Sequence, residues 1–200
     1  MNKKFELSTV RFDNPEFVLK YAVNHSRKSV KIADKIADIL FMKNLKKGRI
    51  LDAGCGTGIT LIQLAKKIPF RELYGIDLSG ISITAAKEAS QGENLEDRIK
   101  FLKADVMDIP FPDNYFNFVI NIYMLHLVED PVRMLNEIER VLQPEGFFFI
   151  TDLKRNFLSI LEKEMKSAFT EEEVKDIIAQ STIPLGQFSY DMISWKYQSI

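Results

Sequence analysis

A glycine-rich turn constrains this chain more than any other feature of its sequence. Residues 50–60 read ILDAGCGTGIT, so Gly54, Gly56 and Gly58 stand between a short apolar run and the start of a helical pattern. Glycine adopts positive φ without strain and has no Cβ, so such a turn lets a ligand approach the backbone closely. A strand that passes through it into a helix also presents backbone N–H groups to that ligand. The turn predicts the first βα unit of an open, mostly parallel sheet.

From residue 48 onward, short apolar runs alternate with helical patterns, as in a parallel sheet with helices on both faces. Several runs are apolar without alternation, which is typical of strands buried on both sides. The pattern predicts strands over 49–52, 72–77, 99–102, 116–121 and 146–151, and helices over 60–67, 81–90 and 132–142. Later segments predict helices over 157–166 and 170–180, and two closing strands over 187–193 and 194–199.

The first 47 residues differ from the rest in charge. They carry 11 Lys and Arg against 5 Asp and Glu, whereas the whole chain of 200 residues has a net charge of −1. Apolar residues three or four apart predict an amphipathic helix over 29–42, and a weaker pattern covers 15–24. The basic excess is either a solvated helical face or a cover drawn to an anionic ligand or partner. We expect one domain, with residues 1–47 as a helical extension of residues 48–200.

Composition argues against several classes of protein. The apolar runs are only a few residues long, far below the roughly 20 residues of a membrane helix, and we expect neither a membrane span nor a secretory signal. Cys55 is the single cysteine, so neither an intrachain disulfide nor a multi-cysteine metal site is expected. The near-neutral net charge argues against a general nucleic-acid binder. We therefore expect a cytoplasmic protein with no metal and no DNA partner.

An acid follows the glycine turn at a spacing that suits a nucleoside ligand. Asp77 ends the second predicted strand, 19 residues after Gly58, where a carboxylate can accept hydrogen bonds from ribose hydroxyls. The order G-x-G-x-G, with Ile59 next, departs from the dinucleotide-binding pattern, and the Walker phosphate-binding pattern is absent. The turn and the acid together predict a site for an adenosine-type ligand other than a dinucleotide or ATP.

Four sequence blocks resemble the class I S-adenosylmethionine-dependent methyltransferases, particularly the small-molecule group that includes the ubiquinone and menaquinone biosynthesis methyltransferases. These blocks are residues 50–58, 73–79, 104–113 and 137–146, in the family's order. The resemblance implies a Rossmann-like, doubly wound α/β fold with a seven-stranded, mostly parallel sheet, an antiparallel last strand and an N-terminal helical lid over 1–47. It also implies S-adenosyl-L-methionine as cofactor and S-adenosyl-L-homocysteine as product.

The same resemblance implies roles for individual residues. The backbone of the glycine turn would lie against the methionine and ribose portions of the cofactor, Asp77 would hold the ribose diol, and Asp52 would help to orient the amino group. Asp105 and the Val106 backbone would read the adenine edge. The full set expected to bind cofactor is Asp52, Gly54, Cys55, Gly56, Gly58, Asp77, Leu78, Ala104, Asp105, Val106 and Asn121.

The methyl acceptor is expected beyond the carboxyl end of the fourth strand, where open α/β sheets bind their ligands. Tyr123 and His126 follow that strand and are catalytic candidates, although His126 can equally be a packed or helix-capping histidine. In the N-terminal segment, Tyr21 is a third catalytic candidate, and His25 and Arg27 are candidates for binding the acceptor.

These features predict transfer of a methyl group to a small-molecule acceptor by in-line displacement. Two alternatives stay open: a nonenzymatic S-adenosylmethionine-binding or scaffold subunit, and a methyltransferase of protein or RNA. The acceptor atom and the oligomeric state are left open as well.

Overall fold

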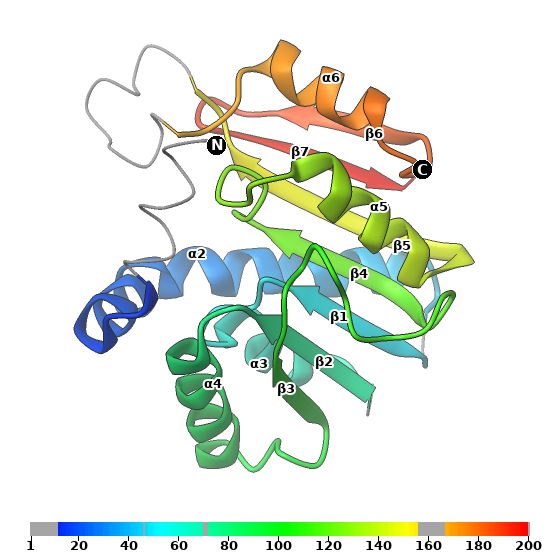
Figure 1. The fold of residues 1–200 in the computed structure, drawn as a ribbon. Coiled ribbons are helices and arrows are strands. Elements are labelled where there is room, and N and C mark those ends of the chain that lie inside the picture. The colour runs from blue at the N-terminus through cyan, green and yellow to red at the C-terminus, as the bar shows by residue number, and fades with distance from the viewer. Residues whose placement is uncertain (1–11, 46, 70–71, 156–166, 200) are drawn as a thin grey trace.

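The structure is a computed structural model that describes residues 12–45, 47–69, 72–155 and 167–199 (Figure 1). Its described strands are β1 (Arg49–Ala53), β2 (Glu72–Asp77), β3 (Ile99–Lys103), β4 (Phe116–Ile122), β5 (Leu142–Leu153), β6 (Gly186–Tyr190) and β7 (Ser194–Ser199). Its described helices are α2 (Pro15–Met42), α3 (Ile59–Ala65), α4 (Gly80–Gly92), α5 (Pro131–Val141) and α6 (Glu171–Gln180). The helix predicted over 157–166 lies outside the described residues.

The seven strands form one sheet in the order β3-β2-β1-β4-β5-β7-β6. All neighbouring pairs from β3 to β5 are parallel, and β7 runs antiparallel to both β5 and β6. The strand order reverses between β1 and β4, and in open α/β sheets the ligand crevice lies at the carboxyl ends of the strands that flank such a reversal. The predicted fold class is confirmed, and it places the site above β1 and β4.

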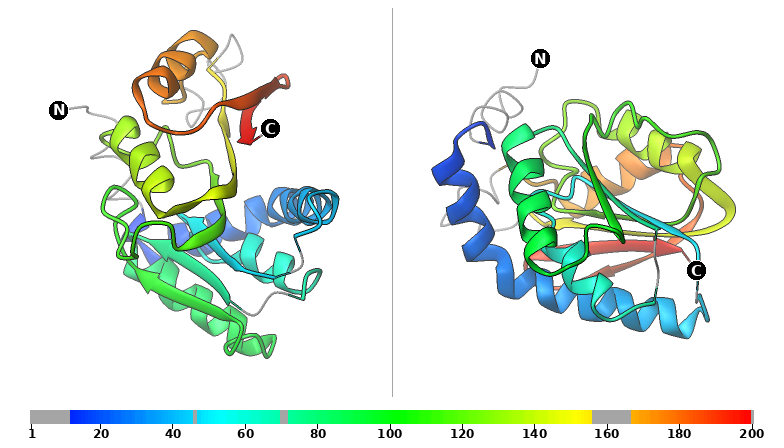
Figure 2. Two further views of the ribbon diagram at one scale, coloured as in Figure 1. Left: turned by 90° about the vertical axis from the view of Figure 1, so that its right-hand side faces the viewer. Right: turned by 90° about the horizontal axis from the view of Figure 1, so that it is seen from below.

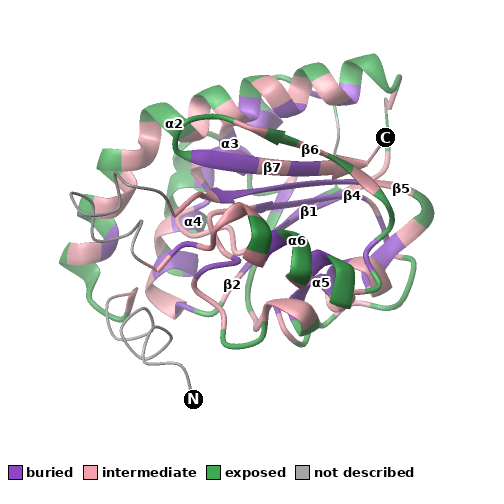
Figure 3. Ribbon diagram, turned by 90° about the horizontal axis from the view of Figure 1, so that it is seen from above, coloured by how far each residue is buried: buried purple, intermediate pink, exposed green. Residues whose placement is uncertain are grey.

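Helices cover both faces of this sheet (Figure 2), and its central strands β1 and β4 are largely buried (Figure 3). Ile36 of α2 and Leu61 of α3 belong to one buried cluster with Ile50 of β1. Leu135 of α5 belongs to a second cluster, together with Leu51 of β1. Since successive side chains of a strand point to opposite faces, Ile50 and Leu51 assign α2 and α3 to one side of the sheet and α5 to the other.

Residues 15–42 form one continuous helix, where the sequence predicted two helices over 15–24 and 29–42. Asn14 caps its first turn through a 3.1 Å hydrogen bond from the Phe17 N–H, and Pro15 occupies a position that helices favour. The polar residues near the expected break, such as Asn24, face solvent, so they do not interrupt the backbone. The N-terminal turns of α2 lie on the side where β1 and β4 end (Figure 1).

The strand expected over 187–193 ends earlier, at Tyr190. Asp191 is the reason, because its Oδ1 accepts hydrogen bonds from the Ile193 and Ser194 N–H groups at 3.0 and 2.7 Å. This side chain closes a tight turn into β7, so residues 191–193 leave the ladder. Among the described residues, no helix combines the length and the apolar character needed to cross a membrane.

Candidate functional site

A cavity of about 330 Å³ opens at the carboxyl ends of β1, β2, β3 and β4. Its walls come from the glycine turn, the ends of these strands, the loop after β3 and the N-terminal half of α2. The expected site residues on its walls are Tyr21, His25, Asp52, Gly54, Cys55, Gly56, Asp77, Leu78, Asp105, Val106 and Tyr123. The fold therefore gathers most of the predicted cofactor residues, and three of the five predicted acceptor-side residues, around one space.

The glycine turn forms the floor of this cavity, and Gly54, Gly56 and Gly58 all have positive φ, at 86°, 52° and 73°. A Cβ on Gly58 would lie 2.6 Å from the Phe101 ring, so glycine is required there by packing within the protein. A Cβ on Gly56 would meet no atom within 4 Å. The open space beside Gly56 is room that a ligand can occupy against the bare backbone.

Asp77 is fixed at the edge of the cavity by two backbone donors. Its Oδ2 accepts a 2.9 Å hydrogen bond from the Gly56 N–H, and its Oδ1 accepts one of 2.9 Å from the Ser79 N–H. Burial raises the pKa of the Asp77 carboxyl, while these two hydrogen bonds act in the opposite direction. Each carboxylate oxygen keeps a further lone pair, so Asp77 can still accept two hydroxyl donors from a ligand.

Asp52, at the base of the cavity, is almost completely buried, with 2% of its surface exposed. Its Oδ1 has no hydrogen-bond partner among the described residues. Burial, with a smaller contribution from Asp77, raises the pKa of Asp52 to about 8. A buried carboxyl without a partner is costly, and a cationic N–H donor of a ligand would supply both the missing hydrogen bond and the opposite charge.

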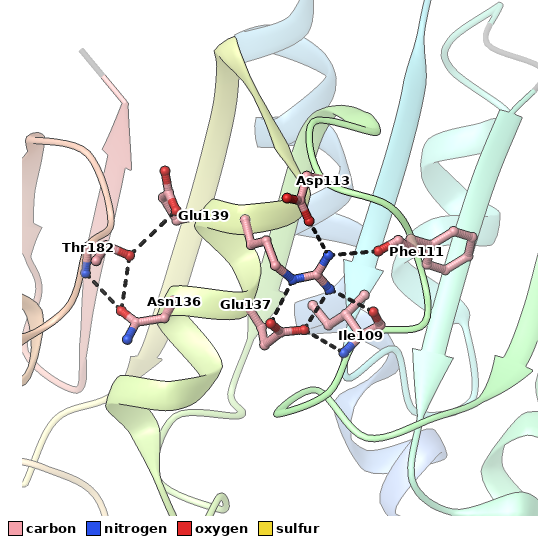
Figure 4. A network of polar contacts seen from close by, with 8 residues as sticks. Ile109, Phe111, Asp113, Asn136, Glu137, Glu139 and Thr182 are labelled. Atoms are coloured by element: carbon pink, nitrogen blue, oxygen red, sulfur yellow. Dashed lines mark hydrogen bonds and ion pairs between the residues drawn. The ribbon is translucent and has the colours of Figure 1, made fainter.

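The loop after β3 carries Asp105 and Val106 to the cavity, and Arg140 of α5 holds this loop in place (Figure 4). The Arg140 guanidinium donates to the carbonyl oxygens of Ile109 and Phe111, each at 2.9 Å, and to both carboxylate oxygens of Glu137 at 2.7 Å. Glu137 in turn accepts a 2.8 Å hydrogen bond from the Ile109 N–H. Two of the sequence blocks, 104–113 and 137–146, thus meet at this arginine.

Substitution of Arg140 by Ala is expected to lower the free energy of unfolding by about 2 kcal/mol, because the loop carbonyls and Glu137 lose a charged donor in a partly buried network. Ligand affinity should fall as well, since Asp105 and Val106 lie on the released loop. Urea denaturation measures the first effect. Arg133→Ala removes an exposed guanidinium from the same helix and should change little; equal losses in the two variants would contradict this role of Arg140.

Five predicted site residues do not line the cavity that the described residues form: Gly58, Ala104, Asn121, His126 and Arg27. Asn121 is fully buried, and its Nδ2 donates to the Ala53 carbonyl oxygen at 2.7 Å, so it ties β4 to the end of β1. Arg27 is exposed, on a different face of α2 from Tyr21 and His25. Since these residues lie outside the cavity lining, their direct contact with a ligand stays a prediction.

His126 is 7% exposed and lies behind the cavity wall. Its backbone N–H donates to Oδ2 of Asp152 at 2.9 Å, and its Nδ1 lies 2.6 Å from Oδ1 of the same carboxylate. Asp152 stands on the neighbouring strand β5 and is 1% exposed. In this position the histidine fastens the segment after β4 to β5, and its catalytic role stays a prediction.

Tyr21 and His25 lie one helical turn apart on α2, and their rings stack with centroids 4.0 Å apart. His25 Nδ1 lies 2.9 Å from the Tyr21 carbonyl oxygen. A carbonyl only accepts, so Nδ1 is the nitrogen that carries the hydrogen in this contact. The pair forms a flat wall of the cavity on the α2 side.

Ser79 and Met124 also line the cavity, although the sequence did not single them out. Ser79 caps α4 and donates from its Oγ to the Phe12 carbonyl oxygen at 2.7 Å, which ties the start of the described chain to the end of β2. A serine directly before a helix is a recognisable capping signal, but its contact with Phe12 depends on the tertiary fold. Within the described ranges, no group of three or more His, Cys, Asp or Glu side chains could hold a metal ion.

The sequence of this chain is similar to those of known proteins. The family described as "Methyltransferase domain" matches residues 51–150. The demethylmenaquinone methyltransferase of Geobacillus kaustophilus is 30% identical over 148 residues, which are 73% of this chain and 59% of that protein. The chain spans about half the length of the curated relatives that it matches. It covers, for example, 46% of the 2-phytyl-1,4-naphtoquinone methyltransferase of Trichormus variabilis.

Solved structures agree with the fold. A SAM-dependent methyltransferase from Aquifex aeolicus superposes with a TM-score of 0.75 over 92% of this chain and 97% of its own, at 24% identity. The [4+2]-cyclase SpnF has a TM-score of 0.56 and 30% identity over 62% of this chain and 46% of its own. The first similarity establishes the architecture, and the second associates a protein named for a different reaction with the same architecture.

Proposed function

The chain belongs to the methyltransferase domain family, and from that premise we propose that it transfers a methyl group from S-adenosyl-L-methionine to a small-molecule acceptor. The observation that carries the proposal is the pairing of Asp77 and Asp52 around the glycine turn. One carboxylate is fixed with lone pairs to spare, and the other is buried with an oxygen that lacks a partner in the described part of the chain. A nucleoside that also bears an ammonium group satisfies both.

The residues present fit this cofactor. Asp77 would accept hydrogen bonds from the ribose hydroxyls, and Asp52 would face the amino group. The bare backbone at Gly56 leaves space for the part of the cofactor that joins these two groups. Asp105 and Val106, on the loop that Arg140 holds, would lie beside the adenine of the cofactor. The bound cofactor would supply an activated methyl group on a sulfonium.

The contribution of the protein to such a transfer is mainly geometric. Alignment of the acceptor with the methyl carbon and exclusion of water account for much of the rate. Tyr21 and His25 on α2 line the same cavity as the end of β4, which supports a role for residues 1–47 as a lid on the domain formed by residues 48–200. We propose that residues 1–47 form this lid and that the protein is located in the cytoplasm.

A second candidate is a protein that binds the cofactor without transferring its methyl group. The similarity to SpnF, which is named as a cyclase, and the position of His126 away from the cavity both favour keeping it. It differs from the first candidate in one measurable respect, because it predicts cofactor binding without methyl transfer.

Methyl transfer is tested with cofactor that carries a tritiated methyl group and an extract separated into small molecules and macromolecules. We expect label in the small-molecule fraction with active protein and none with heat-inactivated protein. Label confined to macromolecules would identify a protein or RNA methyltransferase. Binding of S-adenosylhomocysteine without any label would favour the nonenzymatic candidate, and absence of binding would refute both.

A further inference from the structure

Tyr123, directly after β4, has a backbone conformation that aromatic residues rarely adopt. Its φ is 57°, in the left-handed region, which costs a non-glycine residue of order 1 kcal/mol or more. The Tyr123 N–H donates to the Thr151 carbonyl oxygen of β5 at 2.8 Å. Three residues later, His126 is fastened to Asp152 of β5 by two contacts. The protein therefore holds this turn in a strained state through β5 on both sides of Met124.

The strained turn directs two side chains into the cavity. Tyr123 and Met124 both line it, and Met124 lies against the glycine turn so closely that a Cβ on Gly54 would overlap its side chain. Tyr123 therefore stands next to a residue that contacts the floor of the cofactor site. The acceptor must approach the cofactor from a neighbouring wall, and Tyr123 is on that wall.

The hydroxyl of Tyr123 is available for a ligand. It has no hydrogen-bond partner among the described residues, although the side chain is partly buried. Burial raises the pKa of Tyr123, and the negative charges of Asp152 and Asp191 add to the effect. The phenol therefore stays protonated and can donate a hydrogen bond.

The chain neighbours of Tyr123 that line the cavity are apolar. Ile122, Met124, Leu127 and Val128 line the cavity beside it, so a molecule in this part of the site buries mostly carbon surface. A single donor in an apolar wall selects a ligand by the position of one acceptor atom, because a ligand without that atom leaves the donor unpaired.

We propose that Tyr123 orients the methyl acceptor by donating a hydrogen bond to it, and that the acceptor is a neutral, largely apolar molecule with a hydrogen-bond-accepting oxygen, such as a ketone. This inference rests on the proposed methyl transfer and specifies the class of substrate that the site takes. Tyr123 is then a substrate-binding residue. The strained turn that carries it fixes the position of its hydroxyl relative to the cofactor.

The test uses three probes of one shape: 1-indanone, its hydrocarbon indane, and the anion indane-1-carboxylate. Each is titrated into protein saturated with S-adenosylhomocysteine, and the dissociation constants are measured by ligand-observed NMR. Wild-type protein should bind 1-indanone about five-fold more tightly than either of the other probes, which is the size expected for one hydrogen bond. Tyr123→Phe should abolish the preference for 1-indanone over indane and leave the affinity for S-adenosylhomocysteine and the melting temperature unchanged.

Tyr115→Phe is the matched control, because Tyr115 precedes the other end of β4 and its hydroxyl faces Tyr74 at 3.4 Å. It should keep the full preference for 1-indanone. The proposal is overturned if Tyr123→Phe retains the preference for 1-indanone over indane, if wild-type protein binds no 1-indanone, or if the carboxylate binds best. Failure of S-adenosylhomocysteine itself to bind would overturn the proposed function first, so the two failures are distinguishable.

Discussion

Asp77→Ala should weaken S-adenosylhomocysteine binding by roughly 30- to 150-fold, or about 2–3 kcal/mol, because two hydroxyl hydrogen bonds to a carboxylate are lost. A second cause acts in the same direction. The Gly56 and Ser79 N–H groups lose their acceptor, so the glycine turn keeps only its backbone hydrogen bonds to Ile76 at the end of β2. Calorimetric titration of both proteins with S-adenosylhomocysteine measures the difference.

Asp97→Ala is the control for this substitution, since Asp97 is exposed and lies outside the cavity. It should bind as wild type does. Asp77→Asn, which keeps one acceptor oxygen, should fall between Ala and wild type. If Asp77→Ala binds S-adenosylhomocysteine as tightly as wild type while remaining folded, the ribose assignment is wrong.

The cofactor side of the site was predictable from sequence because its residues are fixed by local rules. The glycine turn follows β1 directly and Asp77 ends β2, and the carboxyl ends of neighbouring parallel strands meet at one edge of a sheet. Spacing along the chain therefore translates into proximity. The parallel part of the fold was predictable for the same reason, since each βα unit has its own pattern of apolar residues, whereas the antiparallel last strand was implied by the resemblance to a family.

The acceptor side was not predictable in this way, because its geometry depends on contacts between distant segments. His126 follows β4 where a catalytic group would stand, yet Asp152, 26 residues later, holds it behind the wall. The strained backbone of Tyr123 also leaves no trace in the sequence, which has neither glycine nor asparagine there. The early end of β6 is an intermediate case, since an aspartate next to a strand is a turn signal that outweighed the apolar Met192 and Ile193.

Asp52→Asn should stabilise the ligand-free protein at pH 8 and have little effect near pH 4. The folded protein raises the pKa of Asp52 from 3.8 to about 8, whereas the unfolded chain keeps the ordinary value. Between these values the folded state binds a proton that the unfolded state does not, so this group lowers stability progressively as pH rises from about 4 to about 8. Asparagine has no such charge, and denaturation of both proteins across this range reveals the difference, on the order of a few kcal/mol at pH 8.

Ligand binding should oppose the stabilising effect of this substitution. An ammonium group beside Asp52 favours its ionised form, so binding of S-adenosylhomocysteine at pH 7 should release a proton, and the heat of binding should depend on the ionisation enthalpy of the buffer. Asp52→Asn should lose this dependence and bind about ten-fold more weakly, because a neutral amide replaces a charged acceptor. Asp108→Asn, an exposed residue after β3, should keep both. A stabilised Asp52→Asn variant that still binds as wild type would mean that the buried charge serves something other than the amino group of the cofactor.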